Sequence, residues 1–284
     1  MRPSLPVALI AGACAAGSAN AELVFGVTLN QSLITFDSEA PGSILSGVPI
    51  MGLQANETIH GIDLRPATGR LYALGSFSRL YTINPATGQA TQVGPAFATP
   101  LNGSSFGFDF NPTVDRIRFI SDADQNLRLH PDTAGVTVDT PLAYVPTDPN
   151  AGVNPNAVAA AYTNSRPGAT STTLFVLDTG LDILAVQNPA NSGMLTTVGP
   201  VGTDLSDLTG FDISGASGRA FAAVRDVSLA RTTFWNISLG TGAGSMIGEV
   251  GGGAILTAMT VTPAPGTLAL LAGLPFLSRR ARAR

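Results

Sequence analysis

The chain has 284 residues, of which only 12% are charged, against about 25% in an average protein. The formal net charge is −4 and the pI is about 5.0. All 15 basic residues are arginine, and four of them stand in the last six positions, so the rest of the chain is more acidic still. This charge balance makes nucleic acid and anionic membranes poor partners.

The first 21 residues have the layout of a secretory signal. Arg2 precedes a small-residue apolar run at Leu5–Ala16, and Ala19–Ala21 is an A-x-A cleavage site. We therefore expect an exported protein whose mature chain begins at Glu22. Cys14, the single cysteine, lies inside the signal, so the mature chain can form neither disulfides nor thiolate metal sites.

One phrase of alternating apolar and polar residues occurs three times. It reads GIDLRPATGRLYAL at 61–74, GFDFNPTVDRIRFI at 107–120 and GFDISGASGRAFAA at 210–223. The alternation has the period of a half-exposed strand, and Pro and Gly between the two halves of the first copy are typical of a turn. Each phrase therefore predicts a β-hairpin.

Each repeat is expected to hold four short strands. In the first repeat they are predicted at Ile59–Leu64, Arg70–Leu74, Arg79–Ile83 and Ala90–Val93. The repeats recur about every 45–50 residues, which matches antiparallel propeller blades and exceeds most helical solenoids. A third, divergent repeat begins near Ala159, where AVAAAYTN replaces the Gly-Phe-Asp phrase.

The two ends of the chain supply a fifth repeat. Ala258–Pro263 aligns with GIDLRP, while Leu23–Thr28 and Leu33–Asp37 supply outer strands. Shared strands of this kind would close the ring and remove an exposed sheet edge. The sequence thus predicts an all-β protein, a β-propeller of about five four-stranded blades closed by N- and C-terminal strands. Six blades are the nearest alternative, and a β-sandwich or a solenoid also remains open.

The repeats carry aspartate and arginine at a constant spacing of seven. Where Ala161 and Thr260 replace the aspartate, the arginine is missing as well. This joint presence predicts structural ion pairs across the hairpins, and the alternative is a ring of carboxylates that binds a cation in the central channel. The expected pairs are Asp63 with Arg70, Asp109 with Arg116, and Asp212 with Arg219.

A second acidic motif places Asp122, Asp124 and Asn126 at alternate positions, as at the opening of a calcium loop. An EF-hand also requires Gly at the sixth position and Glu at the twelfth, and this chain has neither. The motif therefore predicts a looser surface calcium site, with Asp132 as a further candidate ligand. The alternative is that these residues only form a tight turn.

Polar residues also occur in the loops that precede the first strand of each repeat. In a propeller these loops gather at one end of the ring, where ligands commonly bind. A lone loop histidine is also compatible with a merely solvated role. The candidate ligand-binding residues are Glu57, His60, Asn102, Asn156, Asp204 and Asp207.

The C-terminal segment has three parts: TPAPG at Thr262–Gly266, the apolar TLALLAGLPFLS, and RRARAR. This layout resembles the PEP-CTERM class of bacterial sorting signals. The resemblance implies processing by an exosortase-type enzyme, membrane contact only through this segment, and delivery to the outer surface or extracellular matrix. The alternative is an amphipathic tail on a periplasmic protein. The expected organisation is a signal at 1–21, a propeller at 22–262 and a sorting segment at 263–284.

Two stretches resemble a known family. ETIHGIDLRPATGRLYALGS and GFDFNPTVDRIRFISDADQNLRLHPDTA are similar to the domain of unknown function 4394, an exported bacterial domain, and the likeness extends over nearly all of Glu22–Val261. The third repeat departs from the pattern. The resemblance supports the fold and the compartment, but it implies no activity and transfers no catalytic residue.

These observations favour an exported, non-enzymatic propeller that binds a ligand or has a structural role in the cell envelope or extracellular matrix. Its partner would be a glycan or an envelope protein, and no cofactor is expected other than the calcium considered above. The alternative is a polysaccharide hydrolase or lyase, which needs two carboxylates about 5–10 Å apart in a cleft. Stabilisation by calcium would make the melting temperature fall when a chelator is added.

Overall fold

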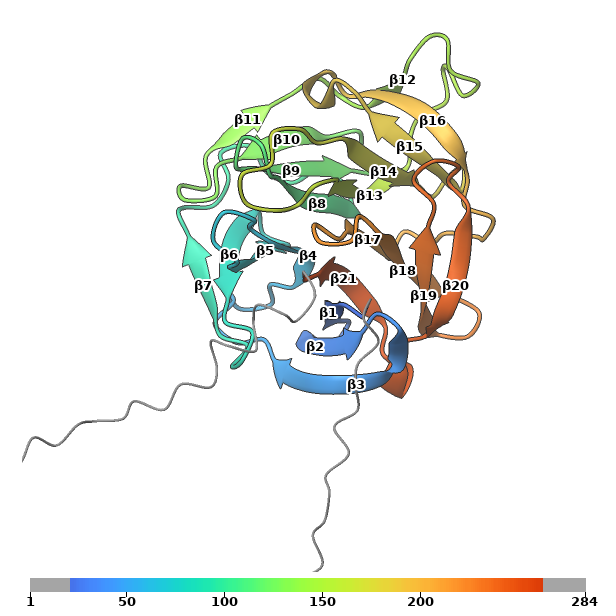
Figure 1. Ribbon diagram of the computed structural model, residues 1–284. Coiled ribbons are helices and arrows are strands. Elements are labelled where there is room, and N and C mark those ends of the chain that lie inside the picture. The colour runs from blue at the N-terminus through green and yellow to red at the C-terminus, as the bar shows by residue number, and fades with distance from the viewer. Residues whose placement is uncertain (1–20, 263–284) are drawn as a thin grey trace, which may run out of the picture.

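The computed structural model describes residues 21–262, and the sequence features expected at 1–20 and 263–284 lie outside the described residues. Within 21–262 the chain forms five β-sheets arranged in a ring, and this is the architecture of a five-bladed β-propeller (Figure 1). The predicted fold class is confirmed. Among the described residues no helix is long and apolar enough to span a membrane.

Blade 1 shows how the sequence produces a blade. Its strands, from the ring axis outwards, are β4 (Ile59–Leu64), β5 (Leu71–Gly75), β6 (Arg79–Ile83) and β7 (Ala90–Val93). These bounds match the predicted ones, except that β5 begins and ends one residue later. The shift arises because the Arg65 N–H donates to the Arg70 carbonyl at 2.9 Å, which places Arg70 in the turn.

Blades 2, 3 and 4 repeat this order, and blade 3 has a short additional strand, β12, that runs parallel to β16. Two short 3₁₀ helices lie in loops, η1 at Ala190–Ser192 and η2 at Gly251–Gly253. The strands are, for blade 2, β8 (Phe106–Asn111), β9 (Arg116–Ser121), β10 (Asn126–Leu129) and β11 (Val136–Val138); for blade 3, β13 (Ala157–Tyr162), β14 (Leu174–Asp178), β15 (Ile183–Gln187), β16 (Met194–Pro200) and β12 (Ala143–Tyr144); and for blade 4, β17 (Thr209–Ile213), β18 (Ala220–Asp226), β19 (Arg231–Ile237) and β20 (Gly244–Glu249).

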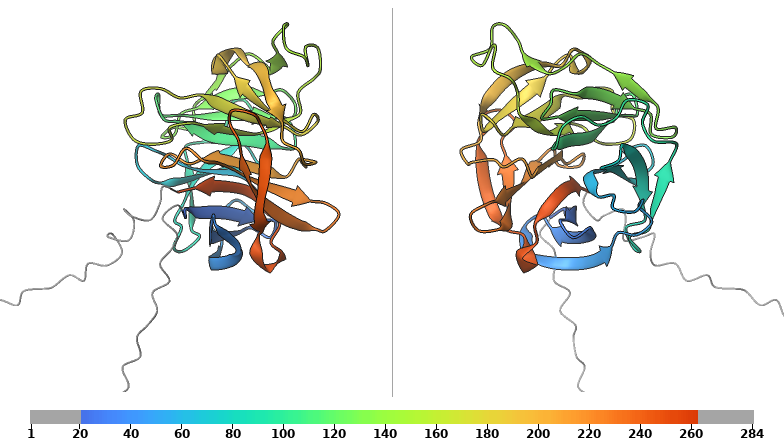
Figure 2. Two further views of the ribbon diagram at one scale, coloured as in Figure 1. Left: turned by 45° about the vertical axis from the view of Figure 1, so that its right-hand side comes forward. Right: turned by 180° about the vertical axis from the view of Figure 1, so that it is seen from behind.

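Blade 5 is built from both ends of the described chain (Figure 2). Its innermost strand is the C-terminal β21 (Leu256–Val261), which pairs with the N-terminal β1 (Leu23–Thr28). Strands β2 (Ser32–Asp37) and β3 (Ala40–Pro49) complete the sheet. The predicted closure of the ring by terminal strands is confirmed, and a hydrogen bond of 2.8 Å from the Thr262 N–H to the Leu23 carbonyl extends the pairing by one step.

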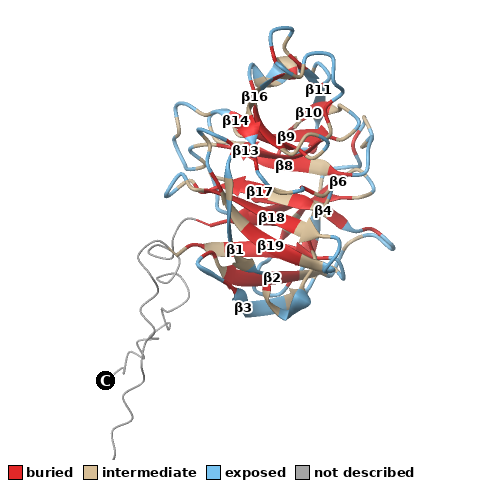
Figure 3. Cartoon of the chain, turned by 90° about the vertical axis from the view of Figure 1, so that its right-hand side faces the viewer, coloured by how far each residue is buried: buried red, intermediate tan, exposed pale blue. Residues whose placement is uncertain are grey.

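The cores lie between neighbouring blades, where apolar side chains of the inner strands pack against one another. Figure 3 shows the resulting pattern, with buried strands near the axis and an exposed outer strand β3. One core cluster joins Tyr72 and Leu74 of blade 1 to Phe108 and Phe110 of blade 2. The ring is therefore held together by apolar contacts between sheets as well as by its closing strands.

The glycine of the repeated phrase is explained by crowding at the axis. The five innermost strands approach one another closely, and Gly61, Gly107 and Gly210 face the next strand around the ring. A Cβ on Gly107 would lie 2.7 Å from the main-chain nitrogen of Ala160 and 2.8 Å from its Cβ. A side chain at this position would therefore push blade 2 away from blade 3.

We expect the substitution Gly107→Ala to lower the free energy of unfolding by about 1–3 kcal/mol, because overpacking strains the neighbouring backbone. Gly240→Ala is the matched control, since nothing lies within 4 Å of its would-be Cβ and its φ needs no glycine. The control should stay within about 0.5 kcal/mol of the parent. Urea denaturation of the three proteins checks this, and equal stability of both variants would contradict the packing explanation.

Candidate functional site

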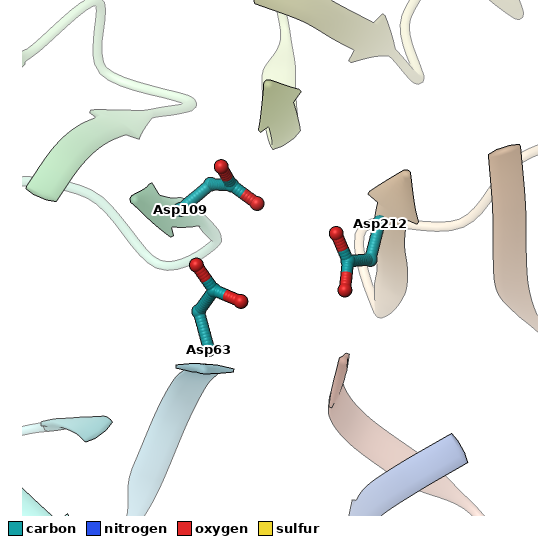
Figure 4. A group of neighbouring side chains, drawn as sticks. All are labelled: Asp63, Asp109 and Asp212. Atoms are coloured by element: carbon teal, nitrogen blue, oxygen red, sulfur yellow. The ribbon is translucent and has the colours of Figure 1, made fainter. Parts of the chain in front are cut away.

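Three aspartates converge where the innermost strands end. Asp63 of β4, Asp109 of β8 and Asp212 of β17 point toward one another at the axis (Figure 4). One carboxylate oxygen from each lies within 4.8 Å of the others, and the side chains are only 1–3% exposed. Closure of the ring places these groups together although they lie in three different repeats.

Each carboxylate reaches toward the next blade around the ring. Asp63 accepts a hydrogen bond of 2.7 Å from the N–H of Phe110, and Asp109 accepts one of 3.1 Å from the N–H of Tyr162. Asp212 accepts one of 2.6 Å from the N–H of Val261. These contacts link blade 1 to 2, blade 2 to 3, and blade 4 to 5, so the aspartate of the repeated phrase connects neighbouring blades.

The two blades without this aspartate show a compensating arrangement. Ala161 of blade 3 and Thr260 of blade 5 have no carboxylate to offer the next blade. In those next blades, 4 and 1, Asp212 and Asp63 each accept the N–H of the residue that follows them in their own strand, at 2.6 Å. The Thr260 hydroxyl lies 3.0 Å from Asp63 Oδ1 and 2.8 Å from Asp212 Oδ2, and it donates to one of them at a time. In this way three carboxylates satisfy one inward N–H from each of five strands.

Burial is the main influence on the proton affinity of these groups. Desolvation raises the pKa of Asp63 and Asp109 well above the usual range, and the charge of neighbouring aspartates raises both further. Desolvation also raises the pKa of Asp212, although its hydrogen bonds from Val261, Thr260 and Ile213 oppose the increase. The cluster therefore holds protons to higher pH than an exposed aspartate does.

The geometry also bears on whether a metal ion would fit here. Three carboxylates at this spacing could in principle bind a divalent cation. However, both oxygens of Asp63 and both of Asp212 already accept hydrogen bonds from main-chain N–H groups. Asp109 accepts one through Oδ1, and its carboxyl group also interacts with Asp212 by a hydrogen bond. Because the oxygens of Asp63 and Asp212 are already engaged, the geometry favours a hydrogen-bonded cluster of carboxyl groups over a cation site.

The predicted Asp–Arg ion pairs are wrong for a clear geometric reason. Within the hairpins, Asp63 is directly opposite Tyr72 and Asp109 is opposite Arg118, so the arginine seven residues on lies in or beside the turn. Arg70 is exposed, and Arg116 donates to the carbonyls of Val114 and Asp115. The aspartates accept main-chain N–H groups at the axis instead, so three predicted ion pairs are wrong: Asp63 with Arg70, Asp109 with Arg116, and Asp212 with Arg219.

Arg219 of blade 4 reaches away from the axis. Its guanidinium forms an ion pair with Glu39 of blade 5 and lies 4.8 Å from the ring centroid of Phe221. Asp212 meanwhile uses its two oxygens for the contacts at the axis described above. In blade 4 the arginine of the repeated phrase therefore forms a contact between blades away from the axis, while the aspartate accepts hydrogen bonds at the axis.

The predicted calcium ligands Asp122, Asp124 and Asn126 do not form one set. The Asn126 side-chain oxygen accepts from the cationic Arg118 at 2.7 Å, so it is turned into the blade and is not available to a cation. Asp122 accepts the Ser104 N–H at 2.8 Å. Asp124 has a positive φ of 59° in the turn, and partial burial raises its pKa. The tight-turn interpretation of this motif fits the structure better.

The loops that precede the innermost strands lie at one end of the ring, which we term the entry face; the opposite end is the exit face. Glu57 was a wrong assignment for a ligand-contacting residue, because it is 5% exposed and accepts from the Tyr81 hydroxyl at 2.6 Å and the Phe77 N–H at 3.1 Å. His60 packs edge-on against Phe106 at the mouth of the axial channel, and burial lowers its pKa. The axial cavity that His60 lines has a volume of only about 20 Å³, room for about one water molecule.

The other four predicted residues lie on the entry face but not in one site. Asn102 is exposed, and its main-chain N–H donates to Gln125. Asn156 donates to Asp207 at 2.9 Å, which joins blades 3 and 4. Asp204 and Asp207 both line a groove beside blade 4. The structure thus brings Asn156, Asp204 and Asp207 near one another and separates them from Asn102.

This groove, which we term the blade 4 groove, has a volume of about 950 Å³. One wall is the loop 203–208, and the other is formed by the ends of β18 and β19 with Met246 of β20. It contains the single tryptophan, Trp235, which is half-buried and donates through its indole N–H to Thr233 at 2.8 Å. Arg225 lines the groove and has no ion-pair partner within residues 21–262. Trp235 and Arg225 lie in regular alternating strands, so the sequence pattern around them gives no sign of a binding site.

One family model matches most of the chain. The family model for the domain of unknown function DUF4394 matches residues 32–260. The chain belongs to this family. The match covers all five blades of the DUF4394 chain except β1 and the last residue of β21, which confirms the resemblance noted in the sequence. No curated protein sequence matches.

Solved structures that are similar to the DUF4394 chain share low sequence identity with it. A protein from Lactobacillus plantarum is 18% identical, covers 84% of this chain and 71% of its own, and has a TM-score of 0.39. A glutaminyl cyclase from Myxococcus xanthus is 13% identical, with coverages of 67% and 76% and a TM-score of 0.43. A putative 6-phosphogluconolactonase from Bacteroides fragilis is 15% identical, with coverages of 84% and 70% and a TM-score of 0.40. At these values none of them indicates a substrate.

Proposed function

We propose that this DUF4394 chain is an exported propeller that binds a glycan in the blade 4 groove, as a non-enzymatic component of the cell envelope or extracellular matrix. The observation that carries the proposal is an aromatic ring and charged side chains facing one open groove, with Trp235 in one wall and Asp204 and Asp207 in the other. Export and processing by an exosortase-type enzyme rest on the sequence of the two ends.

The chemistry of the groove suits a sugar. A pyranose has apolar C–H faces and hydroxyl edges, so it is bound well by a rigid aromatic surface with polar groups around it. Asp204 is exposed and Arg225 lacks an ion-pair partner among the described residues, so both can exchange water for ligand hydroxyls at low cost. The exposed Met246 adds a flexible apolar contact on the same side.

The direction of the pKa shift of Asp226 favours binding over hydrolysis. A glycosidase needs one carboxyl group with a raised pKa beside the substrate. In the blade 4 groove, hydrogen bonds from Ser228 and Leu229 lower the pKa of Asp226, which is the opposite direction. The strongly raised pKa values belong to Asp63 and Asp109, which are buried at the axis.

We expect Trp235→Ala to weaken glycan binding at least tenfold, about 1.4 kcal/mol, because central tryptophans carry much of the energy of binding sites. The measurement is a glycan array and polysaccharide pull-down on the domain 22–262, followed by titration of the best ligand. Trp235→Phe is the matched control and should retain most of the affinity, since it preserves an aromatic face.

Two outcomes would contradict this proposal. One is the absence of binding to any glycan tested, and the other is a ligand whose affinity is the same for the parent and Trp235→Ala. Analysis of the glycan after prolonged incubation separates the two function classes. Shortened or unsaturated products that disappear in Asp204→Asn would favour the hydrolase or lyase alternative instead.

A further inference from the structure

A second cavity lies between blades 2 and 3, on the exit face of the ring. It has a volume of about 330 Å³ and shares no lining residue with the blade 4 groove. Arginines make up a large part of its wall. The lining residues are Asn111, Val114, Arg116, Arg118, Arg128, Tyr162 and Asn191.

Arg118 forms the inner wall of this cavity and is held rigidly. Its side chain is 2% exposed, and its guanidinium donates to Asn126 and Asp139 at 2.7 Å and to Asn191 at 2.6 Å. A buried guanidinium that is fixed on several sides presents its charge at one place without losing further conformational freedom. Arg118 therefore serves as a preorganised positive wall.

The remaining charges leave the cavity electropositive. Asp139 forms an ion pair with Arg118 at 2.7 Å. It also accepts two hydrogen bonds from Arg128, from Nε at 2.7 Å and from Nη2 at 2.9 Å. Arg116 has no ion-pair partner among the residues from 21 to 262, and it donates only to main-chain carbonyls through Nη1. Three guanidinium groups thus line the cavity, Asp139 forms ion pairs with two of them, and Nε and Nη2 of Arg116 remain as charge-assisted donors.

We propose that this cavity binds a small molecule carrying an oxyanion, a carboxylate or a phosphate group, with Arg116 as the principal ligand-contacting residue. The excess of positive charge supplies the attraction, and the Tyr162 hydroxyl and Asn191 amide supply polar contacts for the rest of the ligand. The volume suits a molecule of about the size of a single sugar acid or sugar phosphate. This site is additional to the glycan groove and does not depend on it.

Isothermal titration of the folded domain with glucuronate, and separately with inorganic phosphate, at low ionic strength tests the proposal. We expect binding of at least one of the two, weakening with added salt because the contact is ionic. Neutral glucose should not bind at this site. Binding of glucuronate alone identifies a carboxylate ligand, and binding of phosphate alone identifies a phosphoryl ligand.

The decisive variant is Arg116→Gln, which should weaken binding of the anion at least tenfold while the far-UV spectrum and melting temperature stay the same. Arg70→Gln is the matched control, because Arg70 holds the corresponding position in blade 1 and is exposed. It should leave the affinity unchanged. Failure of both anions to bind at millimolar concentration, or equal affinity of the parent and Arg116→Gln, would overturn the proposal.

Discussion

Replacing Asp63 with alanine is expected to lower the free energy of unfolding by about 2–6 kcal/mol, because two main-chain N–H groups at the axis lose their acceptor. These are the N–H groups of Leu64 and Phe110, which now donate to Asp63 at 2.6 and 2.7 Å. Each unsatisfied N–H costs about 1–3 kcal/mol, and the Thr260 hydroxyl loses its contact with Asp63 Oδ1 as well.

Urea denaturation at pH 5 measures this effect best. At higher pH, removal of one buried negative charge would act in the opposite direction and hide part of the loss. Asp204→Ala is the control, since Asp204 is exposed on the entry face and should change stability by less than about 0.5 kcal/mol. Equal effects of the two substitutions would mean that the axial hydrogen bonds do not stabilise the ring.

The second large effect concerns pH and the substitution Asp109→Asn. The pKa of Asp109 is raised in the folded chain, so the folded state keeps its proton at pH values where the unfolded state, with a pKa near 3.8, has lost it. The stability that protonated Asp109 contributes is therefore fully present below pH about 3.8 and is lost as pH rises through the pKa of Asp109 in the folded state. Asp63 and Asp212 have the same direction of shift. The parent protein should thus become less stable from weakly acidic to neutral and basic pH.

Asparagine at position 109 copies the protonated aspartate. Its side-chain oxygen can accept the Tyr162 N–H, which donates to Asp109 at 3.1 Å in the parent protein, and its side-chain NH₂ group can donate toward Asp212. The variant should be more stable than the parent at pH 8 by about 1.4 kcal/mol for each unit of pKa by which Asp109 is raised, and its stability should depend less on pH. Thermal melting of both proteins between pH 4 and 9 measures this.

A bound divalent cation at the axis would reverse these results. The carboxylates would then have to be ionised, so stability would rise with pH, a chelator would lower the melting temperature of the parent, and Asp109→Asn would be destabilising. The direction of the pH dependence alone therefore distinguishes a proton-sharing cluster from a cation site built on the same three residues.

Much of the fold could be predicted from the repeats in the sequence. The strands of blade 1 and the use of Leu23–Thr28 with the C-terminal strand could be predicted, because alternation, turn residues and repeat spacing are local properties of the chain. The bounds of β5 were shifted by one residue because the turn between Arg65 and Arg70 is longer than the pattern suggests.

The site could be predicted only in part. The residue positions of the aspartates were evident, but their partners were not, because Asp63, Asp109 and Asp212 meet only after three blades have closed around one axis. A constant spacing within one repeat gives no information about contacts between repeats. The blade 4 groove was missed for the same reason, since Trp235 becomes part of a site only when the loop at 203–208 is placed beside it.

The way in which the ring closes has a practical consequence for attachment. Leu23 and Thr262 are joined by a main-chain hydrogen bond at the exit face, whereas the loop 203–208 lies at the entry face. A bead, a fluorophore or an affinity handle attached next to Leu23 or Thr262 would consequently lie at the exit face. Protein immobilised at either position would present the loop 203–208 on the side away from the support, so the two positions are interchangeable for capture experiments.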